Sequence, residues 1–261
     1  MRIARLDLAA TADLIVAEAL SRRGKKAPPA FFTSANGQVL SLAASSRRVA
    51  RFFDEADLVS ADGQPMVLAS SWLTRTPLPQ RVATTDLFHD VAQRAVSSGL
   101  TCYFLGATAD ENAKGLRCIR ALYPKLRIVG ARDGFFSDEE ERSIADEIAK
   151  VGPDILWVSM GVPREQEFIV RNRYRLRGVG IAKTSGGLFN FLSGSHARAP
   201  DWMQRTGFEW LHRLALEPRR LFWRYTSTNV HACYLLFVGT HAARDETDQV
   251  TFNLNPWNRA H

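Results

Sequence analysis

The sequence predicts an α/β fold in which a Rossmann-like parallel sheet core is flanked by helices and followed by a basic helical C-terminal appendage. Short apolar runs typical of buried strands alternate with longer runs of helical periodicity, as in a parallel sheet covered by helices. A chain of 261 residues with 46% hydrophobic content can bury a full-sized core. After about Ser193 the strand-like runs stop, and Trp, Arg and Pro become frequent. We therefore expect a core over residues 1–195, an appendage over 196–244 and a polar, disordered tail over 245–261.

The apolar runs also predict where the core elements lie. A capping box at Ser137 predicts a helix that brings Ile144 and Ile148 onto one face. Two further helices are expected over residues 86–96 and 110–122. The expected strands are residues 30–33, 58–61, 101–105, 127–129, 155–158 and 178–182.

The appendage is basic and amphipathic. Between residues 198 and 224 it holds six arginines against three acidic residues. Four apolar residues fall at helical spacing there, and Pro218 is expected to end that helix and start another. The four residues are Met203, Trp210, Leu211 and Leu214.

The net charge of +7 favours a polyanionic partner, which could be a nucleic acid, an anionic membrane surface or a phosphorylated ligand. The three cysteines form no CxxC pair and the six histidines show no metal-ligand spacing, so we expect neither a zinc site nor a disulfide framework. We identify no secretory signal. The longest apolar candidate, residues 233–238, is far shorter than the about 20 residues that span a bilayer. A cytoplasmic protein, at most peripheral on a membrane, is expected.

Several familiar motifs are incomplete. Gly178-Val179-Gly180 lacks the third glycine of a dinucleotide fingerprint, which argues against an oxidoreductase. Ala182-Lys183-Thr184 resembles the end of a phosphate-binding P-loop, but alanine stands where a glycine is required. Ser159 lacks the preceding glycine of a nucleophile elbow, because Trp157 occupies that position. These motifs support neither nucleotide hydrolysis nor a serine hydrolase.

Six segments, taken together, resemble the WecG/TagA/CpsF family of glycosyltransferases in their order and spacing over about residues 30–228. This family builds enterobacterial common antigen, wall teichoic acid linkage units and exopolysaccharides. The segments are Ala61 to Pro65, Arg81 to Leu87, Phe104 to Thr108, Arg132 to Phe136, Gly161 to Glu167, and the run from Gly186 through Arg198-Ala199-Pro200 to Arg220.

The resemblance implies an inverting transferase that needs neither a metal ion nor another cofactor. Its donor would be a UDP-sugar, such as UDP-N-acetylmannosamine or the corresponding uronic acid, and its acceptor a polyprenyl-diphosphate-linked sugar. The sequence has no Asp-x-Asp pair at a predicted strand end, where a metal-dependent sugar transferase would hold its divalent ion. Because the implied acceptor is lipid-linked and the appendage is basic and amphipathic, we expect peripheral binding to the inner face of the bacterial cytoplasmic membrane. A homo-oligomer is possible.

Asp62 is the candidate catalytic base. It follows the predicted strand 58–61 and so should lie at the carboxyl edge of the sheet, where α/β proteins bind ligands. The alternative is that Asp62-Gly63 simply forms a turn. Inverting transfer needs a base that takes the proton of the acceptor hydroxyl, and the resemblance assigns this role to Asp62.

Further residues are expected to contact the substrates. Ser34 and Asn36 follow the first core strand, although a helix cap is the alternative. Arg81 and Asp86 would orient the donor or pair with each other. In this segment the chain departs from its family, because Thr84 stands where glycine is usual, and this puts a close approach of the backbone to the ligand in doubt.

Four more substrate-binding candidates lie in later segments. Gln166 and Glu167 begin a helix after strand 155–158, and they would bond uracil or ribose unless they form an ordinary solvated first turn. Gly187 and Gly106 belong to the segments that carry the resemblance; Gly187 is equally consistent with a plain loop.

The arginines of the appendage are expected to meet the negative charge of the leaving nucleotide diphosphate. We assign Arg213 and Arg220 to catalysis, and Arg198 and Arg224 to substrate binding. The alternative is a basic face that only touches anionic lipid, and the two roles are compatible.

Two other functions remain open. A non-enzymatic basic protein that binds membrane or nucleic acid would have the same charge, but no nucleic-acid module is recognisable and we expect no nucleic-acid partner. A dinucleotide oxidoreductase lacks its fingerprint.

Overall fold

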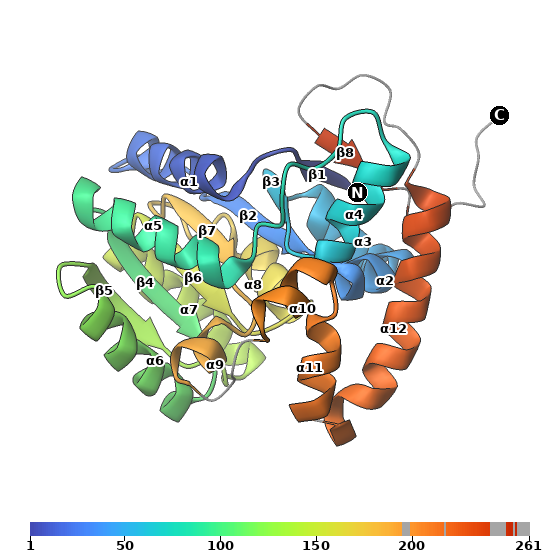
Figure 1. Cartoon of the computed structure of the whole chain (residues 1–261). Coiled ribbons are helices and arrows are strands. Elements are labelled where there is room, and N and C mark those ends of the chain that lie inside the picture. The colour runs from blue at the N-terminus through green and yellow to red at the C-terminus, as the bar shows by residue number, and fades with distance from the viewer. Residues whose placement is uncertain (195–198, 217, 241–248, 253, 255–261) are drawn as a thin grey trace.

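The computed structural model describes residues 1–194, 199–216, 218–240, 249–252 and 254. In this part of the chain a six-stranded parallel sheet has the order β3-β2-β7-β6-β4-β5, and β1 and β8 form a separate antiparallel pair (Figure 1). The predicted α/β class with a Rossmann-like core is confirmed. The strands are β1 (Arg2–Ala4), β2 (Ala30–Ala35), β3 (Leu58–Ala61), β4 (Thr101–Gly106), β5 (Arg127–Arg132), β6 (Ile155–Ser159), β7 (Ile181–Thr184) and β8 (Gln249–Thr251).

Helices cover both faces of the sheet (Figure 1). On one face α1, α5, α6 and α9 pack around Phe32, Phe104 and Trp157, and on the other α7 and α8 pack around Phe31 and Leu156. The helices are α1 (Leu8–Arg22), α2 (Gly37–Ser45), α3 (Arg47–Asp54), α4 (Gln64–Leu73), α5 (Thr84–Ser98), α6 (Ala109–Leu122), α7 (Asp138–Val151), α8 (Arg164–Asn172), α9 (Leu188–Leu192), α10 (Asp201–Thr206), α11 (Glu209–Leu216) and α12 (Pro218–Gly239).

Local signals in the sequence account for most of these boundaries. Ser137 caps α7 in the predicted capping box with Glu140, and both Ile144 and Ile148 are buried. The last expected strand was placed too early. Gly178 has a φ of +100°, which an extended strand does not allow, so the strand starts only at Ile181.

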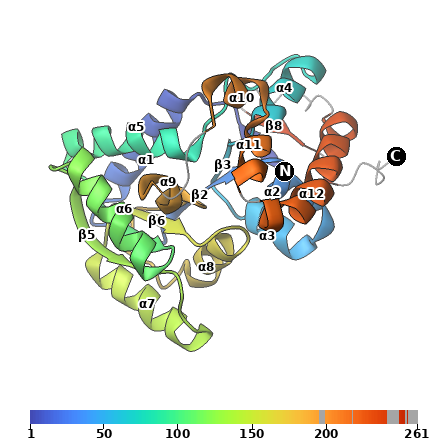
Figure 2. The same cartoon turned by 60° about the horizontal axis from the view of Figure 1, so that its bottom comes forward.

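The C-terminal helices pack directly on the core. Pro218 starts α12 directly after α11, as predicted. Met203 lies in a separate short helix, because Gly207 adopts a left-handed conformation that ends α10. Leu235 and Leu236 of α12 are buried in the same apolar cluster as Leu40 of α2. Figure 2 shows α10–α12 beside α2 and α4.

Part of the expected tail is ordered. Residues 249–251 form β8, which pairs with β1, and Val250 and Phe252 are buried there. Val250 and Phe252 lie two residues apart, the period at which side chains of a strand share one face. The expectation of a disordered tail rested on the overall polarity of the segment, which does not show this local pattern. Residues 241–248, 253 and 255–261 of the predicted appendage and tail lie outside the described residues. Within the described ranges, no helix is long and apolar enough to cross a membrane.

Candidate active site

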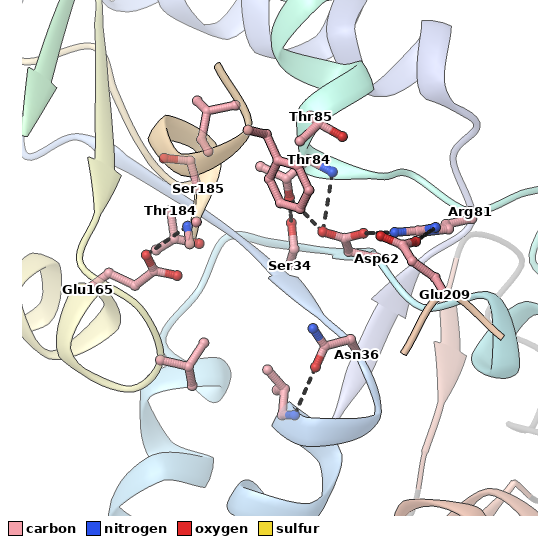
Figure 3. Close-up of a pocket in the computed structure, with 16 residues that line it drawn as sticks. Ser34, Asn36, Asp62, Arg81, Thr84, Thr85, Glu165, Thr184, Ser185 and Glu209 are labelled. Carbon is pink, nitrogen blue, oxygen red and sulfur yellow. Dashed lines mark hydrogen bonds and ion pairs between the residues drawn. The ribbon is translucent and has the colours of Figure 1, made fainter. Parts of the chain in front are cut away.

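A polar pocket lies outside the carboxyl ends of β3, β2 and β7, the edge at which open α/β sheets bind ligands (Figure 3). Residues from α2, α5, the loop before α8, α8, α9 and the first turn of α11 complete it. Hydroxyls and carboxylates dominate its lining. The polar lining residues are Ser34, Asn36, Asp62, Arg81, Thr84, Thr85, Glu165, Thr184, Ser185 and Glu209.

Asp62 is held from two sides. One carboxylate oxygen, Oδ2, accepts hydrogen bonds from the backbone N–H of Thr84 at 3.2 Å and from its hydroxyl at 2.8 Å. The other oxygen, Oδ1, accepts longer bonds of 3.3 and 3.4 Å from the Arg81 guanidinium. The side chain is 19% exposed, so it is fixed in place but open to the pocket. This geometry suits a carboxylate that accepts a proton from a bound hydroxyl.

Thr84 stands where the resemblance led us to expect a glycine, and it contacts the candidate base directly. Its side chain donates the shortest hydrogen bond that Asp62 accepts. Thr84 is also the first residue of α5, at the edge of the pocket. A glycine at this position would keep only the backbone bond. The side chain of Thr84 therefore adds a contact to the candidate base.

Arg81 connects Asp62 to the C-terminal helices. Its Nη1 donates to Glu209 Oε2 of α11 at 2.5 Å, while Nε and Nη2 face Asp62 (Figure 3). Burial lowers the pKa of Arg81, but the two carboxylates outweigh this effect and raise the pKa above its ordinary value. The sequence suggested Asp86 as a partner of Arg81, whereas the structure pairs Arg81 with Asp62 and Glu209.

Ser34 and Asn36 both line the pocket, as their position after the first core strand suggested. Asn36 also caps α2, since its Oδ1 accepts the N–H of Val39 at 3.1 Å, so the capping alternative applies to it. Ser34 Oγ lies 2.9 Å from Ser60 Oγ and 3.3 Å from Thr84 Oγ1.

Two buried ionisable residues were not among the expected site residues: Glu165 lines the pocket, and Lys183 lies beside it. Burial lowers the pKa of Lys183 to about 8, against the opposing attraction of Asp62 and Glu165. Burial raises the pKa of Glu165 to about 7, although the N–H groups of Gly186 and Gly161 donate to its carboxylate. In the sequence, Lys183 could have been noticed as a single lysine at the end of an otherwise apolar strand. Glu165 was part of a segment that carries the family resemblance.

Gln166 and Glu167 are not among the residues that line the Asp62 pocket. Gln166 is fully buried and donates to Thr33 Oγ1 at 3.2 Å, while its Oε1 has no partner in the described part of the chain. Glu167 lines a second cavity, where it forms ion pairs with Arg48 and Arg171. Their expected contacts with a nucleotide remain a prediction.

The remaining expected site residues are distributed more widely. Gly187 lines the pocket at the start of α9, whereas Gly106 ends β4 and Asp86 lies in the first turn of α5, both outside the pocket lining. Arg213 lies in α11 and both Arg220 and Arg224 lie in α12, but their side chains are outside the described part of the structure. Arg198 lies outside the described residues altogether. In the part of the chain that is described, no cluster of His, Cys, Asp and Glu suits a metal ion.

The shifted pKa of Glu165 predicts an unusual dependence of stability on pH. Between pH 4.5 and about 7 the folded protein holds the Glu165 proton while the unfolded chain releases it, so the free energy of unfolding falls as the pH rises. The contribution of this residue is on the order of 3 kcal/mol across that window. Glu165→Gln should remove it, because the amide does not titrate.

Urea unfolding of native protein and Glu165→Gln at pH 5 and pH 8 measures this contribution. We expect the free energy of unfolding of the native protein to fall more between pH 5 and pH 8 than that of Glu165→Gln. The exposed Glu147, substituted in the same way, serves as the control. An identical pH dependence in native protein and Glu165→Gln would contradict the burial of an ionisable Glu165.

The chain matches the family model described as "Glycosyl transferase WecG/TagA/CpsF family" over residues 1–245. An N-acetylglucosaminyldiphosphoundecaprenol N-acetyl-beta-D-mannosaminyltransferase of Bacillus spizizenii is 32% identical over 195 residues, which cover 75% of this chain and 74% of that protein. A protein of the same name from Bacillus subtilis is 29% identical over 227 residues, covering 87% and 84%. The chain that carries the Asp62 pocket therefore belongs to the WecG/TagA/CpsF family of glycosyltransferases.

Proposed function

We propose that this glycosyltransferase moves a sugar of the N-acetylmannosamine type from a UDP-sugar to a polyprenyl-diphosphate-linked sugar in the synthesis of a bacterial surface polysaccharide. The observation that carries the proposal is the pocket at the sheet edge, where Asp62 is held by Thr84 and Arg81 but stays open to a ligand. The names of the two Bacillus relatives describe transfer of N-acetylmannosamine to N-acetylglucosaminyldiphosphoundecaprenol, which supports this donor and acceptor class.

The proposed reaction is a single displacement with inversion. The acceptor hydroxyl attacks the anomeric carbon from the side opposite UDP, and the new C–O bond forms as the bond to the diphosphate oxygen breaks. Asp62 takes the hydroxyl proton, and the electron pair of the broken bond leaves with UDP. Thr84 orients one carboxylate oxygen, so that the other, with its longer Arg81 contacts, faces the acceptor.

The leaving diphosphate gains negative charge and needs cations or hydrogen-bond donors. We assign this role to Arg213 and Arg220, with Arg198 and Arg224 binding donor or acceptor phosphate, and without a metal ion. The ion pair between Arg81 and Glu209 supports this assignment, because it brings the first turn of α11 to the pocket. The helix that carries Arg213 thus begins at the candidate active site.

We further propose that the enzyme binds the inner face of the cytoplasmic membrane, where its lipid-linked acceptor would lie. The C-terminal helices expose large apolar side chains among their arginines, and such a face can insert into the headgroup region of anionic lipid. The most exposed are Trp202, Trp223, Val230 and Phe237.

The test of the proposed function is UDP release from a panel of UDP-sugars, with a polyprenyl-diphosphate-linked N-acetylglucosamine acceptor and EDTA present. We expect acceptor-dependent release from UDP-N-acetylmannosamine that EDTA does not reduce. Loss of activity in EDTA that Mg²⁺ restores would contradict metal independence. Release that does not depend on the acceptor, or none from any donor in folded protein, would contradict the transferase assignment.

A further inference from the structure

Lys183 is the only lysine with a buried side chain among the residues that the structure describes. It lies near the carboxyl end of β7, on the sheet face that carries Ile181 and the apolar cluster around Phe32. Its ammonium group donates to Ser34 Oγ and to the backbone carbonyl of Thr184, both at 2.8 Å.

An ammonium group in this position is costly for the fold. Burial favours the neutral form of Lys183 and lowers its pKa to about 8. An apolar side chain of similar length would fill the same space without that cost, since replacing buried charges by well-packed apolar groups is often neutral or stabilising. Stability alone therefore does not explain a lysine at this position.

The hydrogen bonds of Lys183 lead to the candidate base through two hydroxyls. An ammonium group only donates and a carboxylate only accepts, so the two ends fix the direction of the path. Ser34 Oγ accepts from Lys183, and Thr84 Oγ1 donates to Asp62 Oδ2 at 2.8 Å. Ser34 has one hydrogen, which it can donate to Thr84 Oγ1 at 3.3 Å or to Ser60 Oγ at 2.9 Å.

Charges of alternating sign lie in the pocket wall and directly behind it. Glu209 pairs with Arg81, Arg81 with Asp62, and the positive charge of Lys183 is attracted by both Asp62 and Glu165. Asp62 thus interacts with two cations: with Arg81 in direct contact, and with Lys183 through the hydroxyls of Ser34 and Thr84.

We propose that Lys183 is a positioning residue for Asp62, which it orients through the hydroxyls of Ser34 and Thr84. The inference rests on the proposed function, because it assumes that Asp62 is the base. The ammonium group leaves Ser34 free to donate toward Thr84, and Thr84 in turn directs its own hydrogen at Asp62 Oδ2. This arrangement keeps Oδ1 turned toward the acceptor hydroxyl. Lys183 itself touches neither substrate.

The test compares Lys183→Met, Thr84→Val and the double variant with the native enzyme in the UDP-release assay. Methionine keeps most of the volume but removes the donor and the charge. We expect kcat to fall by about 10²-fold in each single variant, with the KM values for donor and acceptor within twofold of native. The kcat of the double variant should be no lower than that of the less active single variant, because both substitutions break the same path.

Lys114→Met, at an exposed lysine of α6, is the matched control and should leave kcat unchanged. The melting temperature of Lys183→Met should not fall, which separates positioning from structural damage. Native kcat in folded Lys183→Met, a raised KM with unchanged kcat, or multiplicative losses in the double variant would each overturn the proposal. Inactivity of the native enzyme with every donor would instead refute the proposed function, before any variant is compared.

Discussion

Asp62→Asn is expected to lower kcat for UDP-sugar-dependent transfer by about 10²- to 10⁴-fold, the range over which a general base contributes. Asparagine has nearly the same shape and can still accept the hydrogen bonds of Thr84. It cannot take a proton from the acceptor hydroxyl. The KM for the donor should change little, because the substitution removes an interaction of the transition state rather than of the bound substrate.

The fold should tolerate this substitution. Arg81 keeps its ion pair with Glu209, so no buried guanidinium is left without a carboxylate. Asp13→Asn, on the exposed side of α1 and paired with Arg94, is the control for the same chemical change away from the pocket. Full activity in Asp62→Asn would exclude Asp62 as the base and move that role to another pocket carboxylate, Glu165 or Glu209.

The sequence predicted the edge of the sheet at which the pocket lies because local patterns determine it. Buried strands are apolar runs, and the residues that follow parallel strands share one edge. Ser34 and Asn36 at the end of β2, Asp62 after β3 and Gly187 after β7 are brought together for this reason. Arg81 was predicted from the family resemblance and lies in the same pocket.

The sequence could not predict which of several neighbouring residues in a helix points its side chain into the pocket. Successive residues of an α-helix point about 100° apart, so the first turn of α8 sends its side chains in different directions. Glu165 lines the pocket, Gln166 is buried near Thr33, and Glu167 turns to Arg48. Only the packing of α8 on the sheet determines which of the three reaches the site.

Contacts between segments far apart in the chain could not be predicted from the sequence either. Glu209 reaches Arg81 across 128 residues, and Lys183 reaches Ser34 across 149. The second contact depends on strand order, because β7 lies beside β2 although β3, β4, β5 and β6 come between them in the sequence. The first depends on how α11 packs beside the pocket. A regular pattern of apolar residues carries no information about that order, so these partners emerge only in the folded chain.

Gly106→Ala is expected to destabilise the protein by about 3–5 kcal/mol, the range of severe backbone and packing conflicts. Gly106 has a φ of +138°, a conformation essentially restricted to glycine. A Cβ there would lie 2.1 Å from the carbonyl oxygen of Ser159, in the strand that pairs directly with β4. That carbonyl accepts the N–H of Ala107 at 2.9 Å, so it cannot move without breaking a bond at the sheet edge.

Urea unfolding measures this loss, and Gly24→Ala separates its two causes. Gly24 also has a positive φ, +74°, but a Cβ there would meet nothing within 4 Å, so its substitution should cost only about 1–2 kcal/mol of backbone strain. A larger loss at Gly106 isolates the clash with Ser159, whereas equal losses would contradict the close approach of β4 and β6. The fold itself requires glycine at position 106, because any Cβ would clash with Ser159. Reduced activity in Gly106→Ala therefore supports the expected substrate contact only if the variant is shown to be folded.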